Sequence, residues 1–247
     1  MKVFTISDGY FFIKYGSPGK RLRLPVNVYL IKEDGRNILI DTGPGVSERF
    51  NKEKYEIEKP RNLLPALSDL GINAGDIDVV ILTHLHFDHS DGIFSHDGSA
   101  VFRNALHIIN ATEWNYFFKF GDVSRRELYS DLSSKVELKH IEGDLELSEN
   151  IRIKHSYGHT PGFQYVTATD NEGVSHIFPG DIMPTVWHLN NSNSEEAEHE
   201  SQALEKTKAS ILKNVCENGS IIYFQHSASI KSSKIRHDNS NYRIVRT

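Results

Sequence analysis

The chain has 247 residues, 38% of them apolar and 25% charged, which is typical of a globular protein and not of a disordered one. Its formal net charge of −5 does not favour binding to phosphate backbones, so we expect no nucleic-acid partner. The single cysteine, Cys216, cannot form an intramolecular disulfide. No run approaches the ~18 apolar residues of a spanning helix, and the first residues lack the apolar core of a signal peptide. We expect a cytoplasmic protein without a membrane partner.

The first part of the chain is predicted to consist mainly of strands. Residues 2–7 (KVFTIS) and 10–15 (YFFIKY) predict an opening hairpin, and residues 25–43 predict a second hairpin around Asp34-Gly35. A short helix is expected to begin near Pro65 and to end at Gly71. The next segment, DIDVVILTH, is a continuous apolar run of the kind found in strands that are buried on both faces.

The second part alternates helices and strands. Residues 112–132 and 195–219 have helical patterns, the latter with its apolar residues near one face. Strands are expected in residues 105–110, 145–159, 164–181 and 220–226. Two β-rich halves covered by helices predict a layered α/β sandwich that forms one domain over residues 1–247.

A histidine-rich stretch, ILTHLHFDHSDG, occupies residues 81–92. His84, His86 and Asp88 lie two residues apart, a spacing that puts side chains on one face of an extended segment but not of a helix. His84 and His86 can therefore converge on one metal ion. Asp88 and His89 follow where the chain turns, so they could reach a second ion nearby.

Four more polar residues follow β-like runs in the same way: Asp41, His159, Asp181 and His226. If these strands end at the same edge of the fold, the polar residues that follow them lie together in one cleft, as active-site residues often do. Five histidines and two aspartates can hold two divalent ions with one bridging carboxylate, and such ligands suit Zn, Fe, Mn or Co.

The segments THLHFDHSDG, GHTPG, FPGD and the late QH, together with DTG at 41–43, resemble motifs of the metallo-β-lactamase superfamily of hydrolases. The resemblance covers nearly the whole chain and implies an αββα sandwich with a dinuclear site at one edge. It implies that Asp41 orients the metal-binding loop. The ligands it implies are His84, His86 and His159 for the first ion, Asp88, His89 and His226 for the second, and Asp181 as the bridge.

The resemblance also implies a mechanism. A hydroxide that bridges two divalent ions, zinc being the expected metal, would attack an ester-type carbonyl. Asp181, which would bridge the ions, and Asp88, which would lie beside the hydroxide, are the expected catalytic residues. Asp88 could carry the proton to the leaving oxygen.

Two segments are similar to one branch of the superfamily, the quorum-quenching lactonases that open N-acyl-homoserine lactones. These segments are DIMPTVWH at 181–188 and the Glu-Trp pair of the middle helix. They predict a small-molecule lactone substrate. The loop that carries Trp187 and His188 is expected either to line the metal cleft and contact the substrate or to pack against the core. Several lactonases have a tyrosine three residues after the bridging aspartate, where this chain has Pro184. Either His188 or a tyrosine from elsewhere replaces it, or the substrate is different.

Other functions of this superfamily are alternatives. A thioesterase of the glyoxalase II type would need a helical C-terminal region, for which only residues 231–247 remain. A phosphotriesterase-like enzyme, a nuclease and a non-catalytic binding protein are further alternatives, the last two less consistent with the charge and with the complete ligand set. The aromatic N-terminal hairpin could also pair with a second subunit in a homodimer.

Overall fold

The computed structural model describes residues 1–14, 21–45, 56–58, 63–192 and 198–245. Its first seven strands are β1 (Lys2–Lys14), β2 (Arg21–Glu33), β3 (Arg36–Ile40), β4 (Glu56–Glu58), β5 (Val79–Ile81), β6 (Leu106–Asn110) and β7 (Glu137–Ile141). The other seven are β8 (Leu145–Glu146), β9 (Ile151–His155), β10 (Gln164–Thr169), β11 (Ser175–Phe178), β12 (Ile221–Tyr223), β13 (Ser232–Asp238) and β14 (Asn241–Val245). They form two sheets, with the orders β4-β1-β2-β3-β5-β6-β7 and β14-β13-β12-β11-β10-β9-β8.

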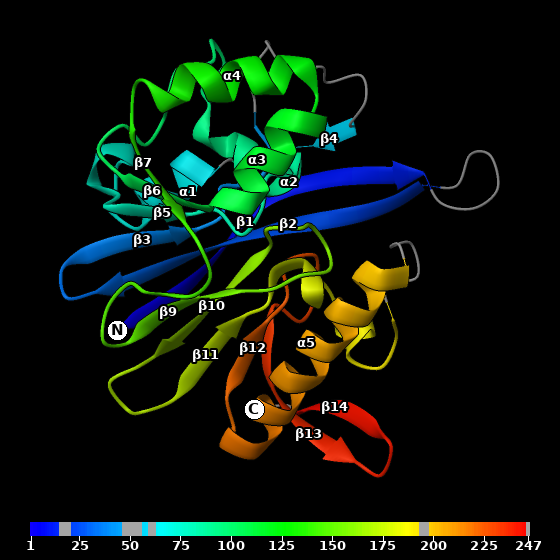
Figure 1. The fold of residues 1–247 in the computed structure, drawn as a ribbon. Helices are drawn as coiled ribbons and strands as arrows, with labels where there is room; N and C mark the ends of the chain where they lie inside the picture. Colours follow the sequence, from blue (N-terminus) through cyan, green and yellow to red (C-terminus); the bar gives the residue numbers. More distant parts are fainter. Residues whose placement is uncertain (15–20, 46–55, 59–62, 193–197, 246–247) are drawn as a thin grey trace.

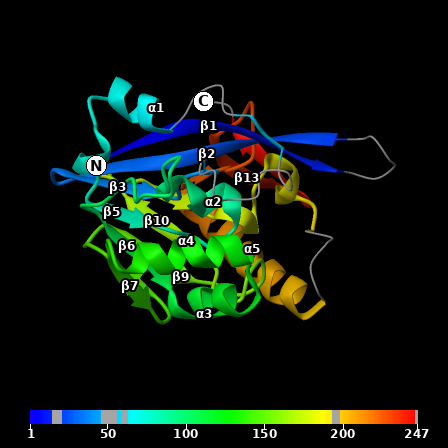
Figure 2. The same cartoon turned by 90° about the horizontal axis from the view of Figure 1, so that it is seen from above.

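Helices cover the outer faces of both sheets (Figure 1). They are α1 (Leu63–Asp69), α2 (Phe87–Ser90), α3 (Ala111–Phe120), α4 (Val123–Ser133) and α5 (Glu198–Asn218). Short 3-10 helices are η2 (Ala74–Asp76), η3 (Asp91–Ile93), η4 (Gly180–Ile182) and η5 (Val186–Leu189). The helices α3 and α4 lie over the first sheet, whereas α5 lies against the second (Figures 1 and 2).

Three apolar clusters separate these four layers. One lies between the first sheet and its helices, where Leu67 of α1 and Leu128 of α4 are buried. The second lies between the sheets and contains Ile40 and Ile153, and the third lies beneath α5 around Leu212. Because burial of apolar surface is the main force that joins the layers, this arrangement confirms the expected αββα sandwich.

The predicted opening hairpin is wrong. Residues 2–14 form one long strand, which pairs with β2 from Lys2–Lys32 to Lys14–Arg21. The register shifts between Ser7 and Tyr10, and Gly9 there has a positive φ of 95°. Asp8-Gly9 therefore makes an irregularity within a strand, although the dipeptide alone is also typical of a turn. The ends of β1 and β2 project beyond the rest of the molecule (Figure 2).

Other predicted elements are confirmed with small changes. The hairpin at Asp34-Gly35 joins β2 to β3, and both turn residues have positive φ, 49° and 81°. The helical segment 112–132 is two helices, because Gly121 ends α3 and the Asp122 side chain caps α4. None of the helices in the described ranges has the length and apolar character needed to cross a bilayer. That residues 1–247 form one domain stays a prediction.

Candidate metal centre

The strands that precede the polar residues end at common edges. β3 runs parallel to β5, so Asp41 and the His84 segment leave the first sheet side by side. β11 runs parallel to β12, so Asp181 in η4 and His226 leave the second sheet together. His159 lies in the loop that joins β9 to β10. The sequence expectation that these polar termini gather is therefore met by the topology.

The histidine-rich stretch has the predicted local shape. After β5 ends at Ile81, the chain continues without regular structure, and His86 has the extended angles φ −69° and ψ 151°. His86 is also the residue before α2, a single turn that contains Asp88 and His89. The change from extended chain to helix ends the two-residue alternation of side chains. The His89 ring still lies close to His84, with 4.0 Å between the ring centres.

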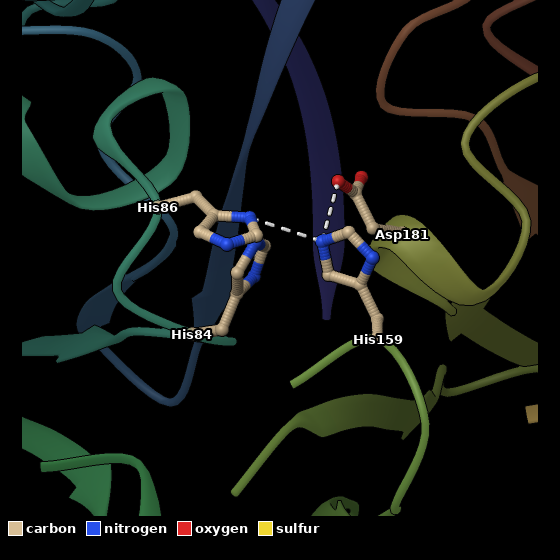
Figure 3. A group of neighbouring side chains, drawn as sticks. All are labelled: His84, His86, His159 and Asp181. Carbon is tan, nitrogen blue, oxygen red and sulfur yellow. Dashed lines mark hydrogen bonds and ion pairs between the residues drawn. The ribbon is translucent and has the colours of Figure 1, made fainter. Parts of the chain in front are cut away.

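Four side chains form a first group: His84, His86, His159 and Asp181 (Figure 3). One ligand atom from each lies within 4.8 Å of the others. His159 Nε2 lies 3.0 Å from His86 Nδ1 and 3.2 Å from Asp181 Oδ2. Such mutual distances between nitrogen and oxygen atoms are those of groups that can share one ion about 2 Å from each.

A second group consists of Asp88, His89 and His226, which are all buried. The Asp88 Oδ2 atom lies 3.4 Å from His226 Nε2 and 3.6 Å from His89 Nε2. Asp181 lies between the groups, because its Oδ2 is 3.3 Å from His89 Nε2 and its Oδ1 is 3.3 Å from His226 Nε2. The structure thus brings together all seven residues that the sequence analysis expected as metal ligands, with Asp181 between the two groups.

Hydrogen bonds hold the histidine rings in defined orientations. His226 Nδ1 donates to the Pro25 carbonyl oxygen over 2.8 Å, and His89 Nδ1 lies 2.8 Å from Asp41 Oδ2. His84 Nδ1 lies 3.0 Å from Thr83 Oγ1. A ring that carries its proton on Nδ1 presents a lone pair on Nε2, the form in which imidazole binds metals.

Asp41 is the centre of this supporting network. It is fully buried, with a positive φ of 58° that is rare for a residue other than glycine. Its Oδ1 accepts from Thr83 N over 2.8 Å, and its Oδ2 accepts from Thr83 Oγ1 over 2.9 Å and from Gln225 Nε2 over 3.1 Å. These contacts, with the one to His89, support the orienting role that the sequence resemblance implied.

Several supporting residues were not selected from the sequence. Thr83 and Gln225 contact Asp41, and Asn27 donates from Nδ2 to the carbonyl oxygens of residues 224, 225 and 227, which surround His226. Asn27 does carry a signal, because it is an isolated amide within the apolar run of β2. A buried amide in such a run needs partners, but the sequence does not show which ones.

The charges of the site suit a cation. Burial lowers the pKa of His84 well below its usual value, and the neighbouring histidines lower it further, so this ring is neutral. Burial would also lower the pKa of His89, but the carboxylates Asp181, Asp88 and Asp41 raise it well above its usual value. The buried His84 Nε2 has no hydrogen-bond partner among the described residues. A metal ion would satisfy this lone pair and the surrounding carboxylates, so the residues present fit the expected cofactor.

The loop after Asp181 presents the two expected substrate residues. Trp187 is 57% exposed, whereas Leu189 beside it packs into the core. His188 is half-buried, its Nδ1 lies 2.9 Å from Thr185 Oγ1, and burial lowers its pKa to about 4, so the ring is neutral. The loop therefore packs against the core through Leu189 and exposes the Trp187 ring. That Trp187 and His188 line the metal cleft stays a prediction.

Comparisons with known proteins agree with these findings. The family model described as the metallo-beta-lactamase superfamily matches residues 21–191. The chain is 28% identical over 159 residues to N-acyl homoserine lactonase AiiA of Bacillus thuringiensis subsp. kurstaki, a match that covers 60% of each chain. The matched part thus spans about three fifths of this relative.

Solved structures show the same fold. A probable metal-dependent hydrolase from Staphylococcus aureus superposes with a TM-score of 0.81 at 22% identity, covering 100% of this chain and 97% of the other. AidC, a dizinc quorum-quenching lactonase solved with a product, gives a TM-score of 0.76 at 18% identity and covers 98% and 93%. These neighbours confirm the fold, and the AiiA relative shows the similarity to the lactonase branch.

Proposed function

The chain belongs to the metallo-β-lactamase superfamily, and on that premise we propose that it is a metal-dependent hydrolase that opens lactones of the N-acyl-homoserine type. The observation that carries the proposal is the convergence of two ligand groups on Asp181. The superfamily and the dizinc neighbour support divalent ions as the cofactor, and we propose zinc among the metals that this ligand set suits.

The proposed ligands follow from the two groups. His84, His86 and His159 would hold one ion. Asp88, His89 and His226 would hold the other, and Asp181 would be shared. When bound, two divalent ions supply Lewis-acid polarisation of the carbonyl and activation of water at neutral pH. Asp41, through its bonds to Thr83 and His89, keeps the imidazole lone pairs directed at the ions.

We propose that Asp88 moves the proton of the reaction. Hydrolysis of an ester requires a proton on the leaving oxygen, and a carboxylate beside the attacking water can accept and then deliver it. Asp88 is buried, and its Oδ2 is held between the Nε2 atoms of His89 and His226. On this proposal the Asp88 carboxylate would lie beside the attacking water, and the shared Asp181 would set the separation of the two ligand groups.

The substrate contacts are proposed for the loop of residues 184–191. Several hydrogen bonds anchor the loop. Among them, His226 N donates to the Pro184 carbonyl over 2.8 Å, and Lys208 Nζ donates to the Asn191 carbonyl over 2.7 Å. The neutral His188 ring could donate a hydrogen bond to the lactone carbonyl, in place of the tyrosine that several lactonases have where this chain has Pro184. The exposed Trp187 ring would contact the acyl chain.

A thioesterase of the glyoxalase II type and a phosphotriesterase-like enzyme stay alternatives to the lactonase. The net charge of −5 supports a small-molecule substrate over a nucleic acid. Cytoplasmic location and a homodimer stay predictions.

A substrate panel tests the proposal. Lactones, aryl esters, phosphotriesters and thioesters are offered to the protein loaded with Zn, Mn or Co, and kcat/KM is measured for each pair. We expect acyl-homoserine lactones to give the largest kcat/KM. A clear preference for another substrate class would identify that class, and not lactones, as the substrate. Absence of any hydrolysis by fully metal-loaded protein would contradict the proposed activity altogether.

A further inference from the structure

Between His84 and His86 of the first group lies Leu85, whose peptide groups are held from both sides by buried charged side chains. Leu85 N donates to Glu113 Oε1 over 3.0 Å. Arg125 Nη2 donates to the Leu85 carbonyl oxygen over 2.7 Å. Glu113 is 2% exposed and Arg125 is 7% exposed, so water does not compete for these contacts.

The same two side chains reach the other loops of the site. Glu113 Oε2 accepts a hydrogen bond from Gly162 N over 3.3 Å, and Gly162 lies three residues after His159. A Cβ on Gly162 would lie 2.1 Å from Glu113 N, so only glycine permits this close approach of the loop to α3. One carboxylate thus links the segment that carries His84 and His86 to the loop that carries His159.

Arg125 holds the other end of the histidine-rich stretch. Its guanidinium makes a two-pronged contact with Asp91, from Nη2 to Oδ1 over 2.7 Å and from Nε to Oδ2 over 2.9 Å. The group also lies 5.0 Å from the centre of the Phe117 ring of α3. A planar, stacked guanidinium has little freedom, so it fixes the Leu85 carbonyl firmly.

We infer that Glu113 and Arg125, from the neighbouring helices α3 and α4, are positioning residues that set the distance between His84, His86 and His159 and thereby the affinity of the first ion. The inference rests on the proposed function. It goes beyond it because neither side chain belongs to the ligand groups. In the second group, His89 is supported by Asp41 and His226 by Pro25. Changes at Glu113 should therefore affect one ion more than the other.

The test is metal retention, which does not require turnover. Purified, metal-loaded protein is titrated with a chelator, and the metal content is followed by elemental analysis for the wild type and for Glu113→Gln. A glutamine has one acceptor oxygen, so one of the two N–H groups loses its partner. We expect the variant to release one ion at a chelator concentration about 10–100-fold lower than the wild type requires. The concentration that releases the other ion should change by less than about threefold.

Two matched controls lie on α4. Glu127→Gln changes an exposed carboxyl group of α4, and Arg126→Lys changes a side chain that donates to the Phe118 carbonyl over 3.0 Å and not to the histidine-rich stretch. Both should retain two ions as the wild type does. Arg125→Lys should resemble Glu113→Gln, because lysine cannot reproduce the two-pronged contact. The double variant with Glu113→Gln and Arg125→Lys should weaken metal binding by less than the product of the two separate effects. Both side chains act on the peptide groups of Leu85, so their effects are not independent.

The outcomes are distinguishable. Equal retention of both ions by the wild type and Glu113→Gln would overturn the inference while leaving the proposed function intact. A wild type that binds no metal would contradict the proposed function itself. If Glu113→Gln does not fold, Glu113→Asp is measured instead, with the same expected weakening of one ion. Loss of the fold in both variants would also overturn the inference, since Glu113 would then stabilise the whole protein.

Discussion

Single residues decide whether the two halves of the site act together, and Asp181 is the clearest case. Its two carboxylate oxygens lie within 3.2–3.3 Å of ring nitrogens from both ligand groups. Asp181→Ala should therefore lower kcat/KM more than about 100-fold, because the second ion loses its shared ligand. Steady-state kinetics with saturating metal measure the effect.

The control for this substitution is Asp170→Ala. Asp170 lies 3.2 Å from His176 Nε2 and is absent from both ligand groups, so its loss should leave kcat/KM nearly unchanged. Near wild-type turnover by Asp181→Ala would show that the reaction does not use two bridged ions.

Trp187 should determine the preference for the acyl chain. Its ring is 57% exposed on a loop that is otherwise well anchored, so apolar substrate atoms can cover it. Trp187→Ala should raise KM for long-chain lactones by about tenfold, with kcat almost unchanged, because the lost contact lies away from the reacting bond. KM is compared across lactones of increasing chain length.

Phe120→Ala serves as the comparison, because Phe120 is 63% exposed on α3. It should leave the chain-length dependence of KM as it is in the wild type. An identical shift in both variants would mean that surface hydrophobicity in general, and not Trp187, governs the preference.

At the scale of elements, strand β6 contains a histidine, His107, that should make the free energy of unfolding depend on pH. His107 is fully buried, its Nδ1 lies 3.0 Å from the Ala105 carbonyl oxygen, and burial lowers its pKa to about 4. The unfolded chain, with an ordinary pKa of about 6.5, binds a proton that the folded chain does not. The stability that the neutral ring provides is therefore present above pH 6.5 and is lost as the pH falls towards 4.

Between pH 7.5 and 5 the loss should be about 2 kcal/mol for this one group. Denaturant unfolding of metal-free protein at both pH values measures it, because bound metal would add its own pH dependence. His107→Gln should be less stable at pH 7.5 but should lose less stability on acidification. An equally steep loss in this variant would assign the pH dependence to other groups.

The elements differ in how well local sequence patterns predict them. The strand β5 and the helix α5 follow from local patterns, a continuous apolar run and an amphipathic period. The opening hairpin was wrong because Asp8-Gly9 is compatible with both a turn and a strand irregularity. Only the long-range pairing of β1 with β2 decides between these, and no local pattern contains that information.

For the whole molecule, the sequence predicted the ligands better than their supports. His84, His86 and Asp88 stand in a spacing that has chemical meaning by itself. The supports Glu113 and Arg125 lie 28 and 40 residues from Leu85 along the chain, so only the folded structure shows their contacts. Metal ligands need defined residue types, whereas a hydrogen bond to a peptide group can come from many residue types at many positions.

The assembly of the site from both sheets predicts that metal stabilises the entire fold. His84 to His89 are attached to the first sheet, and His159, Asp181 and His226 are attached to the second. Ions that join these groups bind only the folded chain, and metal at a thousandfold excess over its Kd adds about 4 kcal/mol of stability. For a chain of this size, chelation should lower Tm by about 10 °C, and added metal should restore it. Thermal unfolding measures the shift, which should be smaller in Asp181→Ala. An unchanged Tm after the metal has demonstrably been removed would mean that the two sheets are held together without the ions.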